Sequence, residues 1–379
     1  MSMTSSVARP LPVPSRDAPA GAGALAWLKT NLFPTWISTA VTLALGYIIV
    51  RIIIAFVSWA LFNAIWTVPY SANGIAQTAV CQNIKGIGAC WAVIADKYRL
   101  ILFGRYPYDE QWRPAIVVLI FIGLYAVSAM RRFWRKELVL IWVGALTVVG
   151  VLMWGGVFGL PVVSDDQWGG LPITLILATF GLAFGFPLAV LVALGRRSTH
   201  LPAVKTLCVV YVELIRGVPL ISVLFMASVM FPLFMPAGVN IDKLLRAQIA
   251  IILFAAAYLA EVVRGGLQAL PKGQAEAADA LGLSYWKKTG FIVLPQALRL
   301  VIPPLVNTFI GFFKDTSLVL IIGLFDLLTM GKVALSDPPW QSFSTEVYIT
   351  LALIYIAFCF AMSRYSRGLE RELGASQRR

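Results

Sequence analysis

Histidine is nearly absent from this chain, and the only one, His200, follows a basic pair in a predicted loop. The four cysteines include no pair with metal-site spacing such as Cys-x-x-Cys, so no metal centre is expected. A membrane enzyme would need His, Cys, Asp or Glu clustered at one depth, and a single loop histidine argues against one. The chain also lacks a Gly-x-x-x-x-Gly-Lys-Ser/Thr phosphate loop, so it is not expected to hydrolyse ATP by itself.

Charged residues are scarce as well. They make up 13% of the 379 residues, against about 25% in soluble domains, while 59% are hydrophobic. The formal net charge of +13 would suggest nucleic acid for a soluble protein. Here the basic residues cluster in short loops beside apolar runs, as orientation signals do, so nucleic acid is not an expected partner. We therefore expect an all-α polytopic protein surrounded by membrane lipid.

Eight apolar stretches are long enough to cross a bilayer as helices. They lie at residues 36–61, 114–130, 138–154, 171–194, 207–234, 247–263, 297–328 and 347–362. The first three belong to an N-terminal extension, residues 31–155, and the last five to a core, residues 171–366. The fifth contains Pro219 and Pro232, which are expected to interrupt its helix.

Basic residues orient these stretches. The block at residues 131–136, RRFWRK, marks the cytoplasmic side. Counting from it places both termini in the cytoplasm and a polar, irregular insert, residues 63–113, in the periplasm. The proline-rich residues 1–30 predict a disordered cytoplasmic tail, residues 367–379 a second tail, and no removed secretory signal is indicated.

Two cysteines, Cys81 and Cys90, lie in the predicted periplasmic insert. An oxidising compartment would permit a disulfide between them. Two free thiols fit the sequence equally well, so the pairing is left open.

A polar, alanine-rich stretch at residues 274–295, QAEAADALGLSYWKKTGFIVLP, separates the sixth and seventh apolar stretches. Pro271 suits a helix start, and Gly282 lies where a left-handed cap would end that helix. Ser284 can cap a second short helix, which Pro295 is expected to end. Glu276 is followed by Ala277 and Ala278, whose side chains are methyl-sized, so the backbone of the first helix could closely approach a partner.

Seven residues of this loop match a signature at fixed spacing: Glu-Ala-Ala, three residues, Gly, nine residues, Ile, one residue, Leu-Pro. They are Glu276, Ala277, Ala278, Gly282, Ile292, Leu294 and Pro295. In this the chain resembles the permease subunits of ATP-binding-cassette (ABC) importers, whose two coupling helices dock into a cleft of the ATP-hydrolysing subunit. The resemblance implies that residues 271–297 couple the chain to an ATPase. The alternative is an ordinary solvated loop between membrane helices.

Two copies of Glu-x-x-Arg-Gly occur at predicted helix ends, at Glu213 and Arg216 and again at Glu261 and Arg264. A spacing of three residues places each acid beside its base on one helix face. Each pair can therefore neutralise itself where an isolated charge would be costly. They could line or latch an inner gate, or they could be static pairs that anchor helix ends.

A row of polar residues interrupts the seventh apolar stretch. It consists of Lys314, Asp315, Thr316 and Ser317, with Asn307 two helical turns earlier. An amino acid is a zwitterion, so Asp315 could bind its ammonium group and the other four could donate to its carboxylate. A helix break there would also free backbone groups to face a ligand. The structural alternative is that Lys314 and Asp315 pair and cap a helix break.

The stretches at residues 307–323 and 211–220, YVELIRGVPL, resemble the polar amino acid uptake permeases of the histidine, glutamate and aspartate type. The insert resembles the general L-amino-acid permeases among them. The resemblance implies a C-terminal five-helix type I ABC importer permease core in a bacterial inner membrane. It also implies a second homologous permease, an ATPase dimer that binds ATP and Mg²⁺, a periplasmic amino-acid-binding protein and L-amino acids as substrates, with no cofactor in this chain.

The alternative from another class is an ion-coupled secondary amino-acid transporter. It predicts inverted repeats and acidic ion sites near the membrane midplane. No convincing repeat is found in the sequence, so the ABC permease is the favoured prediction.

Overall fold

The computed structural model describes residues 23–71, 74, 76–135, 137–236, 238 and 241–377, without the side chains of residues 24, 25, 131 and 372–377. Residues 1–22 of the predicted tail and Lys136 of the basic block lie outside these ranges. Residues 24–30, predicted to be disordered, instead belong to helix α1 (Ala24–Leu32). Its alanine, leucine and lysine residues favour a helix, which the proline-based prediction overlooked.

The chain divides into two compact units. The first comprises residues up to Ile65 together with Cys81–Ala89, and the second comprises Trp66–Val80 together with the chain from Cys90 onward. The second unit thus holds all five core stretches and also the second and third stretches of the predicted N-terminal extension.

Seven helices in the described ranges are long and apolar enough to cross a membrane, or up to eight when a bent pair counts as one span. Together with that pair, they overlap the eight predicted stretches. They are Trp36–Phe62 (α2, Trp36–Val57, and η1, Ser58–Phe62), Tyr108–Ala129 (η2, Tyr108–Glu110, and α5, Trp112–Ala129), Glu137–Trp154 (α6), Gly170–Arg196 (α7), Lys243–Ala269 (α10), Ile302–Ile322 (α14, Ile302–Asp315, and η8, Thr316–Ile322) and Ser344–Arg371 (α16, Ser344–Gln377), with the pair α8 (Pro202–Arg216) and α9 (Leu220–Phe225) to Phe234.

Shorter elements connect these spans. They are α3 (Ala79–Asn83), α4 (Ala92–Phe103), η3 (Arg131–Phe133), η4 (Asp165–Gln167), η5 (Met226–Met230), η6 (Phe231–Phe234), α11 (Lys272–Ala280), α12 (Tyr285–Lys288), η7 (Thr289–Val293), α13 (Leu294–Leu300), β1 (Phe325–Asp326), α15 (Leu327–Ala334) and η9 (Pro338–Trp340).

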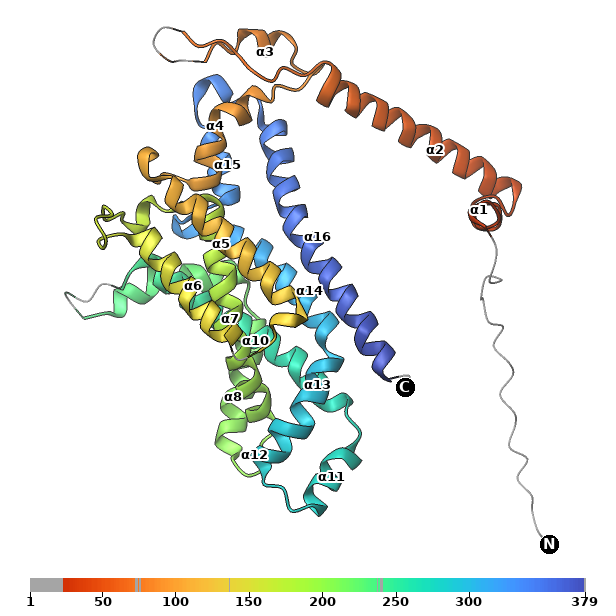
Figure 1. The fold of residues 1–379 in the computed structure, drawn as a ribbon, viewed down its shortest axis with the longest axis vertical. Coiled ribbons are helices and arrows are strands. Elements are labelled where there is room, and N and C mark those ends of the chain that lie inside the picture. The colour runs from red at the N-terminus through yellow and green to blue at the C-terminus, as the bar shows by residue number, and fades with distance from the viewer. Residues whose placement is uncertain are drawn as a thin grey trace. The chain divides into compact units, whose positions relative to one another are not determined.

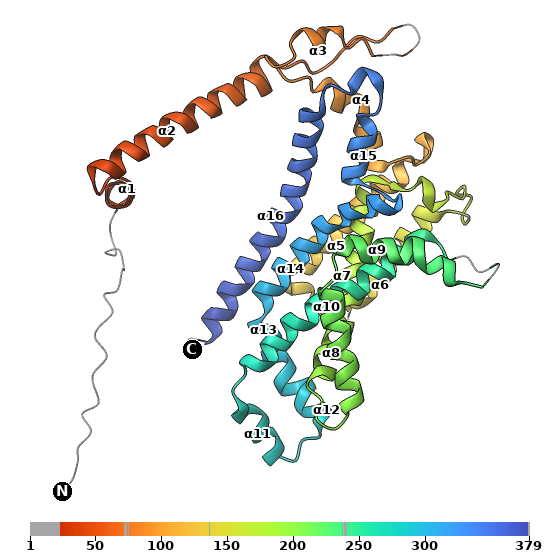
Figure 2. The same ribbon diagram turned by 180° about the vertical axis from the view of Figure 1, so that it is seen from behind.

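The centre of the second unit is formed by α7 and α10, which both views place side by side (Figures 1 and 2). About half of the most apolar window of each is buried, 50% and 56% respectively. Gly185 allows the close approach, because a Cβ there would lie 3.1 Å from the Cβ of Ala255. Small residues on facing helices are how membrane helices pack without a hydrophobic driving force.

The fifth predicted span is sharply bent. α8 and the helix that begins with α9 meet at 104°. The bend lies at Gly217, Val218 and Pro219, where the proline lacks an N–H and disfavours helical geometry at the residue before it. The predicted interruption at Pro219 is confirmed, and it brings Pro219 and Leu220 to a cavity described below.

Candidate functional site

The predicted docking loop lies at one end of the second unit, with α4 and α15 at the other (Figure 1). Its first helix, α11, follows Pro271 and ends two residues before Gly282, whose φ is +71°. The N–H of Gly282 donates to the carbonyl of Asp279 at 2.9 Å, and that of Leu283 to the carbonyl of Ala278 at 3.1 Å. These two bonds form a Schellman cap, so the role predicted for this glycine is confirmed.

The second half of the loop differs from the prediction. Ser284 precedes α12, but the chain continues through η7 into α13 without leaving helical geometry. Pro295 therefore lies within a continuous helical run and does not end a helix. It occupies the first turn of α13, directly after the π-helical turn of η7.

The two loop helices are tied to each other and to α13. Lys288 on α12 forms a 2.6 Å ion pair with Asp279 on α11. Gln296 on α13 donates to the side-chain oxygen of Gln274 at 3.3 Å. Side-chain contacts thus join the two helices of the loop to each other and the loop to α13.

The seven signature residues do not all face outward. Glu276, Ala277, Gly282 and Pro295 are exposed, Ile292 and Leu294 are half-buried, and Ala278 is buried. The loop also exposes large apolar side chains that the motif does not include: Leu281, Trp286 and Phe291 are 78%, 70% and 80% exposed. Apolar side chains on a polar loop are typical of a protein contact, and their presence in the polar stretch could have indicated this.

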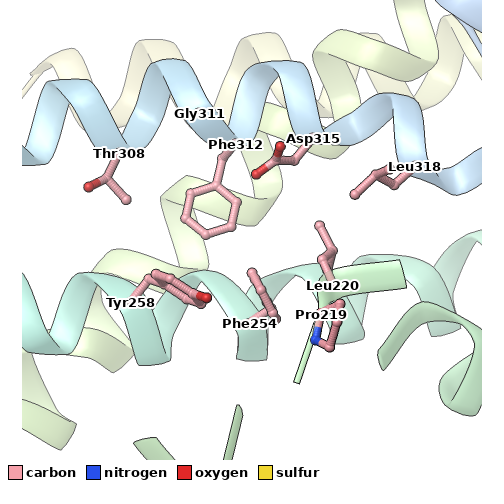
Figure 3. A pocket seen from close by; sticks show the side chains of 9 residues that line it. All are labelled: Pro219, Leu220, Phe254, Tyr258, Thr308, Gly311, Phe312, Asp315 and Leu318. Atoms are coloured by element: carbon pink, nitrogen blue, oxygen red, sulfur yellow. The ribbon is translucent and has the colours of Figure 1, made fainter. Parts of the chain in front are cut away.

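A cavity of about 400 Å³ lies beyond the bend in the fifth span. Figure 3 shows its lining, which comes from the start of α9 and from α10, α14 and η8. The lining residues are Pro219, Leu220, Phe254, Tyr258, Thr308, Gly311, Phe312, Asp315 and Leu318. Three of the rings pack together, with the centroids of Phe254 and Tyr258 4.8 Å apart and that of Phe312 6.0 Å from Phe254. The cavity is therefore mainly apolar, with one carboxyl group.

Of the five residues predicted to bind substrate, only Asp315 lines this cavity. Thr316 is buried and donates to the carbonyl of Phe313 at 2.8 Å, which serves the helix end. Lys314 is exposed, and Asn307 and Ser317 are not among the lining residues. Consecutive helical residues differ in direction by about 100°, so a row of polar neighbours cannot share one site.

Thr308 was missed and stands where Asn307 was expected. It lies seven residues before Asp315, with Gly311 and Phe312 between them, and this spacing follows one helix face. The helix does not break at the predicted place: α14 ends at Asp315, but the chain continues from Thr316 as the tighter η8 within one span, Ile302–Ile322. Tyr258, the other polar lining residue, comes from α10 and has no sequence signal of its own.

The two Glu-x-x-Arg copies join one charge cluster on α7, α8 and α10. Glu261 pairs with Arg264, as predicted, and also with Arg196 at 2.7 Å. The partner of Glu213 is Arg196, at 2.8 Å, rather than its neighbour Arg216. Arg216 instead lies 3.8 Å from Glu261.

Arg196 bridges the cluster and was missed, because a base at a span end was interpreted only as an orientation signal. Its side chain is 11% exposed, against 61% for Glu213, so the cluster reaches solvent on the Glu213 side. Next to it, Arg197 donates to the carbonyl of Leu267 near the end of α10, at 2.9 Å. The last turn of α7 therefore holds the segment that leads into the docking loop.

The cluster also contacts a cavity residue. The guanidinium of Arg216 lies 5.6 Å from the ring centroid of Tyr258. Because Tyr258 lines the cavity, one residue separates the cavity from the charges.

Cys81 and Cys90 are disulfide-bonded, whereas Cys208 and Cys359 are free thiols. Neither disulfide-bonded residue is accessible to solvent.

Comparison with known proteins gives consistent matches. The family model described as "binding-protein-dependent transport system inner membrane component" matches residues 185–374. The Escherichia coli K12 "inner membrane amino-acid ABC transporter permease protein YhdY" is 47% identical over 360 residues, which cover 93% of this chain and 94% of that protein. The "glutamate/glutamine/aspartate/asparagine transport system permease protein BztC" of Rhodobacter capsulatus is 38% identical, with both chains covered completely.

Other relatives are shorter. The "probable glutamine ABC transporter permease protein GlnP" of Bacillus subtilis is 34% identical over 203 residues. This match covers 91% of that protein but only 54% of the present chain. The remaining 9% of such a protein leaves no room for an extension of the present length.

Proposed function

Because this chain belongs to the family of binding-protein-dependent transport system inner membrane components, we infer that it is the membrane-spanning permease subunit of an ATP-driven amino-acid importer. The observation that carries this inference is the match over nearly the full length with an amino-acid ABC transporter permease. The predicted five-helix type I permease core agrees with the family, and the ion-coupled alternative finds no support among these relatives. The subunit is a multi-pass inner-membrane protein and does not itself catalyse ATP hydrolysis.

The chain acts within an ABC importer complex. We propose that the complex contains an ATPase dimer that binds ATP and Mg²⁺, a second homologous permease and a periplasmic amino-acid-binding protein. Both termini would face the cytoplasm, as the basic loops suggest. The loop formed by α11 and α12 would contact the ATPase through Glu276, Ala277 and the exposed apolar residues around them.

The cavity is the proposed passage for the amino acid through this subunit. Asp315 would bind the ammonium group, while the hydroxyls of Thr308 and Tyr258 would bond polar atoms. The rings of Phe254 and Phe312 would cover the aliphatic part of the substrate. These contacts suit a zwitterion better than an anion, because the lining carries a single acid and no base.

The charge cluster would transmit the movement. Closure of the ATPase would shift α11 and α12, and α10 would carry the shift to Glu261 and its arginine partners. Release of Arg196 from Glu213 would then let α8 move and turn the cavity outward. ATP hydrolysis and release would return it inward.

The test of this function is purification of the chain from its native membrane, followed by reconstitution of the whole complex into liposomes. An ATPase subunit should co-purify, and a mixture of radiolabelled L-amino acids should be taken up only with ATP and a periplasmic binding protein. Uptake by the isolated chain driven by an ion gradient would contradict the proposal.

Replacing Asp315 with asparagine should raise the substrate concentration for half-maximal uptake by about ten- to a hundredfold, because a charge-assisted contact with the ammonium group is lost. The maximal rate should change much less, since the substitution keeps the shape of the side chain. Lys314→Gln is the matched control, because Lys314 is adjacent but exposed outside the cavity. Unchanged uptake kinetics in Asp315→Asn would favour a purely structural helix break.

A further inference from the structure

Helix α4 of the insert packs directly against the first helix of the core. A Cβ on Gly104 would collide with the backbone of Gly169, and one on Gly170 would collide with the carbonyl of Leu102. Both Gly104 and Gly170 have φ of +68°, a region that side chains rarely enter. The end of α4 and the start of α7 are therefore in backbone contact.

This contact continues to a second segment, residues 325–346, which holds β1, α15, η9 and the start of α16. Gly169 and Gly170 pair with Phe325 and Asp326 in parallel bridges. In addition, the guanidinium of Arg105, just beyond α4, lies 4.4 Å from the ring centroid of Phe325. The beginning of residues 325–346 is thus held by Gly169 and Gly170 at the start of α7 and by Arg105 just beyond α4.

The other end of the segment is held by side chains of α4. Trp340, fully buried, donates its indole N–H to Asp96 Oδ2 at 2.7 Å. Lys97 forms an ion pair of 2.6 Å with Asp337 and one of 3.1 Å with Asp96. Just before α4, the backbone N–H of Cys90 donates to buried Glu346 at 2.9 Å.

Asp96 is the centre of these contacts, because Tyr70 also donates to its other oxygen at 2.9 Å. Burial raises the pKa of the Asp96 carboxyl, but hydrogen bonds from Lys97, Tyr70 and Trp340 outweigh this and hold the pKa below its usual value. The side chain is therefore an ionised acceptor at neutral pH, and each of its oxygens has a donor.

Residues 325–346 begin three residues after η8, which contributes Leu318 to the cavity wall. The family model matches residues 185–374, and a shorter relative matches only 54% of this chain, so α4 lies outside the part that the family model describes. The contacts of α4 are an addition to a complete core. They lie at the end of the unit opposite the coupling loop (Figure 1).

We propose that α4 is a clamp that holds residues 325–346 at both ends, with Asp96 as its positioning residue. The clamp thereby couples movement of the cavity wall to the ATPase cycle. The clamp rests on the proposed function for its effect on transport. Without it, residues 325–346 would be held to α7 only near their beginning, by the bridges at Phe325 and Asp326 and by the bond from the N–H of Leu327 to Thr174, and more ATP would be hydrolysed for each amino acid moved.

The experiment uses the complete complex in liposomes and two readouts. In Asp96→Ala, amide hydrogen exchange in residues 327–341 should become about tenfold faster, because the indole N–H of buried Trp340 loses its acceptor. The number of amino acids imported per ATP should fall at least about threefold, because looser packing of residues 325–346 would uncouple transport from ATP hydrolysis. Asp96→Asn, which keeps an acceptor oxygen, should restore part of both. Asp109→Ala is the control, an exposed acid of the same insert.

Lys97→Met provides a milder variant should Asp96→Ala fail to assemble, because it removes only the ion pairs of the clamp. Unchanged exchange in Lys97→Met and in any assembled Asp96 variant would overturn the clamp. Faster exchange with an unchanged import ratio would overturn its role in coupling. Amide hydrogen exchange is measured without substrate, so its result tests the clamp whether or not the complex transports amino acids. A wild-type complex that imports no amino acid would refute the proposed function alone.

Discussion

Glu276→Arg should abolish ATP-driven uptake and release the ATPase from the purified complex, while the chain still inserts into the membrane. Glu276 is exposed on α11, so reversing its charge should change the stability of the chain by no more than about 0.5 kcal/mol. At an interface, the same reversal places like charges together and costs several kcal/mol, about a hundredfold or more in affinity. The measurements are uptake in proteoliposomes and the amount of ATPase that co-purifies.

Asp166→Arg is the control for this experiment, an exposed acid just before α7, away from the coupling loop. Gly282→Ala separates shape from charge. No atom lies within 4 Å of its added Cβ, but its φ of +71° makes a side chain cost about 1–2 kcal/mol. It should loosen the cap of α11 and weaken ATPase binding without a clash. Normal uptake by Glu276→Arg would refute the docking role of the loop.

Arg196→Ala should give the second large loss, a fall in uptake of about tenfold or more together with ATP hydrolysis that no longer depends on substrate. The substitution leaves Glu213 without its ion-pair partner and removes one of three arginines around Glu261. Loss of a partner for such groups costs about 1–3 kcal/mol, enough to shift a two-state equilibrium tenfold. Uptake and ATPase activity of the reconstituted complex measure both effects.

This experiment also separates the two readings of the cluster. If the ion pairs only anchor helix ends, Arg196→Ala should lower the thermal stability of the complex while uptake per folded complex and substrate-dependent hydrolysis stay normal. Arg196→Lys should recover part of the function, because one ammonium cannot bridge two carboxylates as a guanidinium does. Lys205→Ala, at an exposed base of α8, is the matched control.

Features that depend on neighbours along the chain could be predicted from the sequence. The eight spans follow from apolar length, the bend at Pro219 from a missing N–H, and the cap at Gly282 from the freedom of glycine. Pro295 was misjudged because proline is as well suited to the first turn of a helix as to its end.

Features that depend on helix rotation or distant contacts could not be predicted. Asn307 was predicted to bind substrate, but Thr308 lines the cavity. The prediction was wrong by one residue, which on a helix changes the direction of the side chain by about 100°. The pairing of Glu213 with Arg196 spans 17 residues and two helices, so the nearer Arg216 was the natural choice from sequence. The role of the insert was left open because its contacts lie in a segment more than two hundred residues later.

The hydrogen bond between Trp340 and Asp96 has a consequence for biosynthesis, because 244 residues separate its two partners. At about 5–20 residues per second, a ribosome needs about 10–50 s to make that stretch. During this time Asp96 has no indole to bind, and only Tyr70, Lys97 and water can solvate its charge. The insert must therefore stay outside the bilayer as the later spans enter, and it can reach its final packing only when the chain is almost finished.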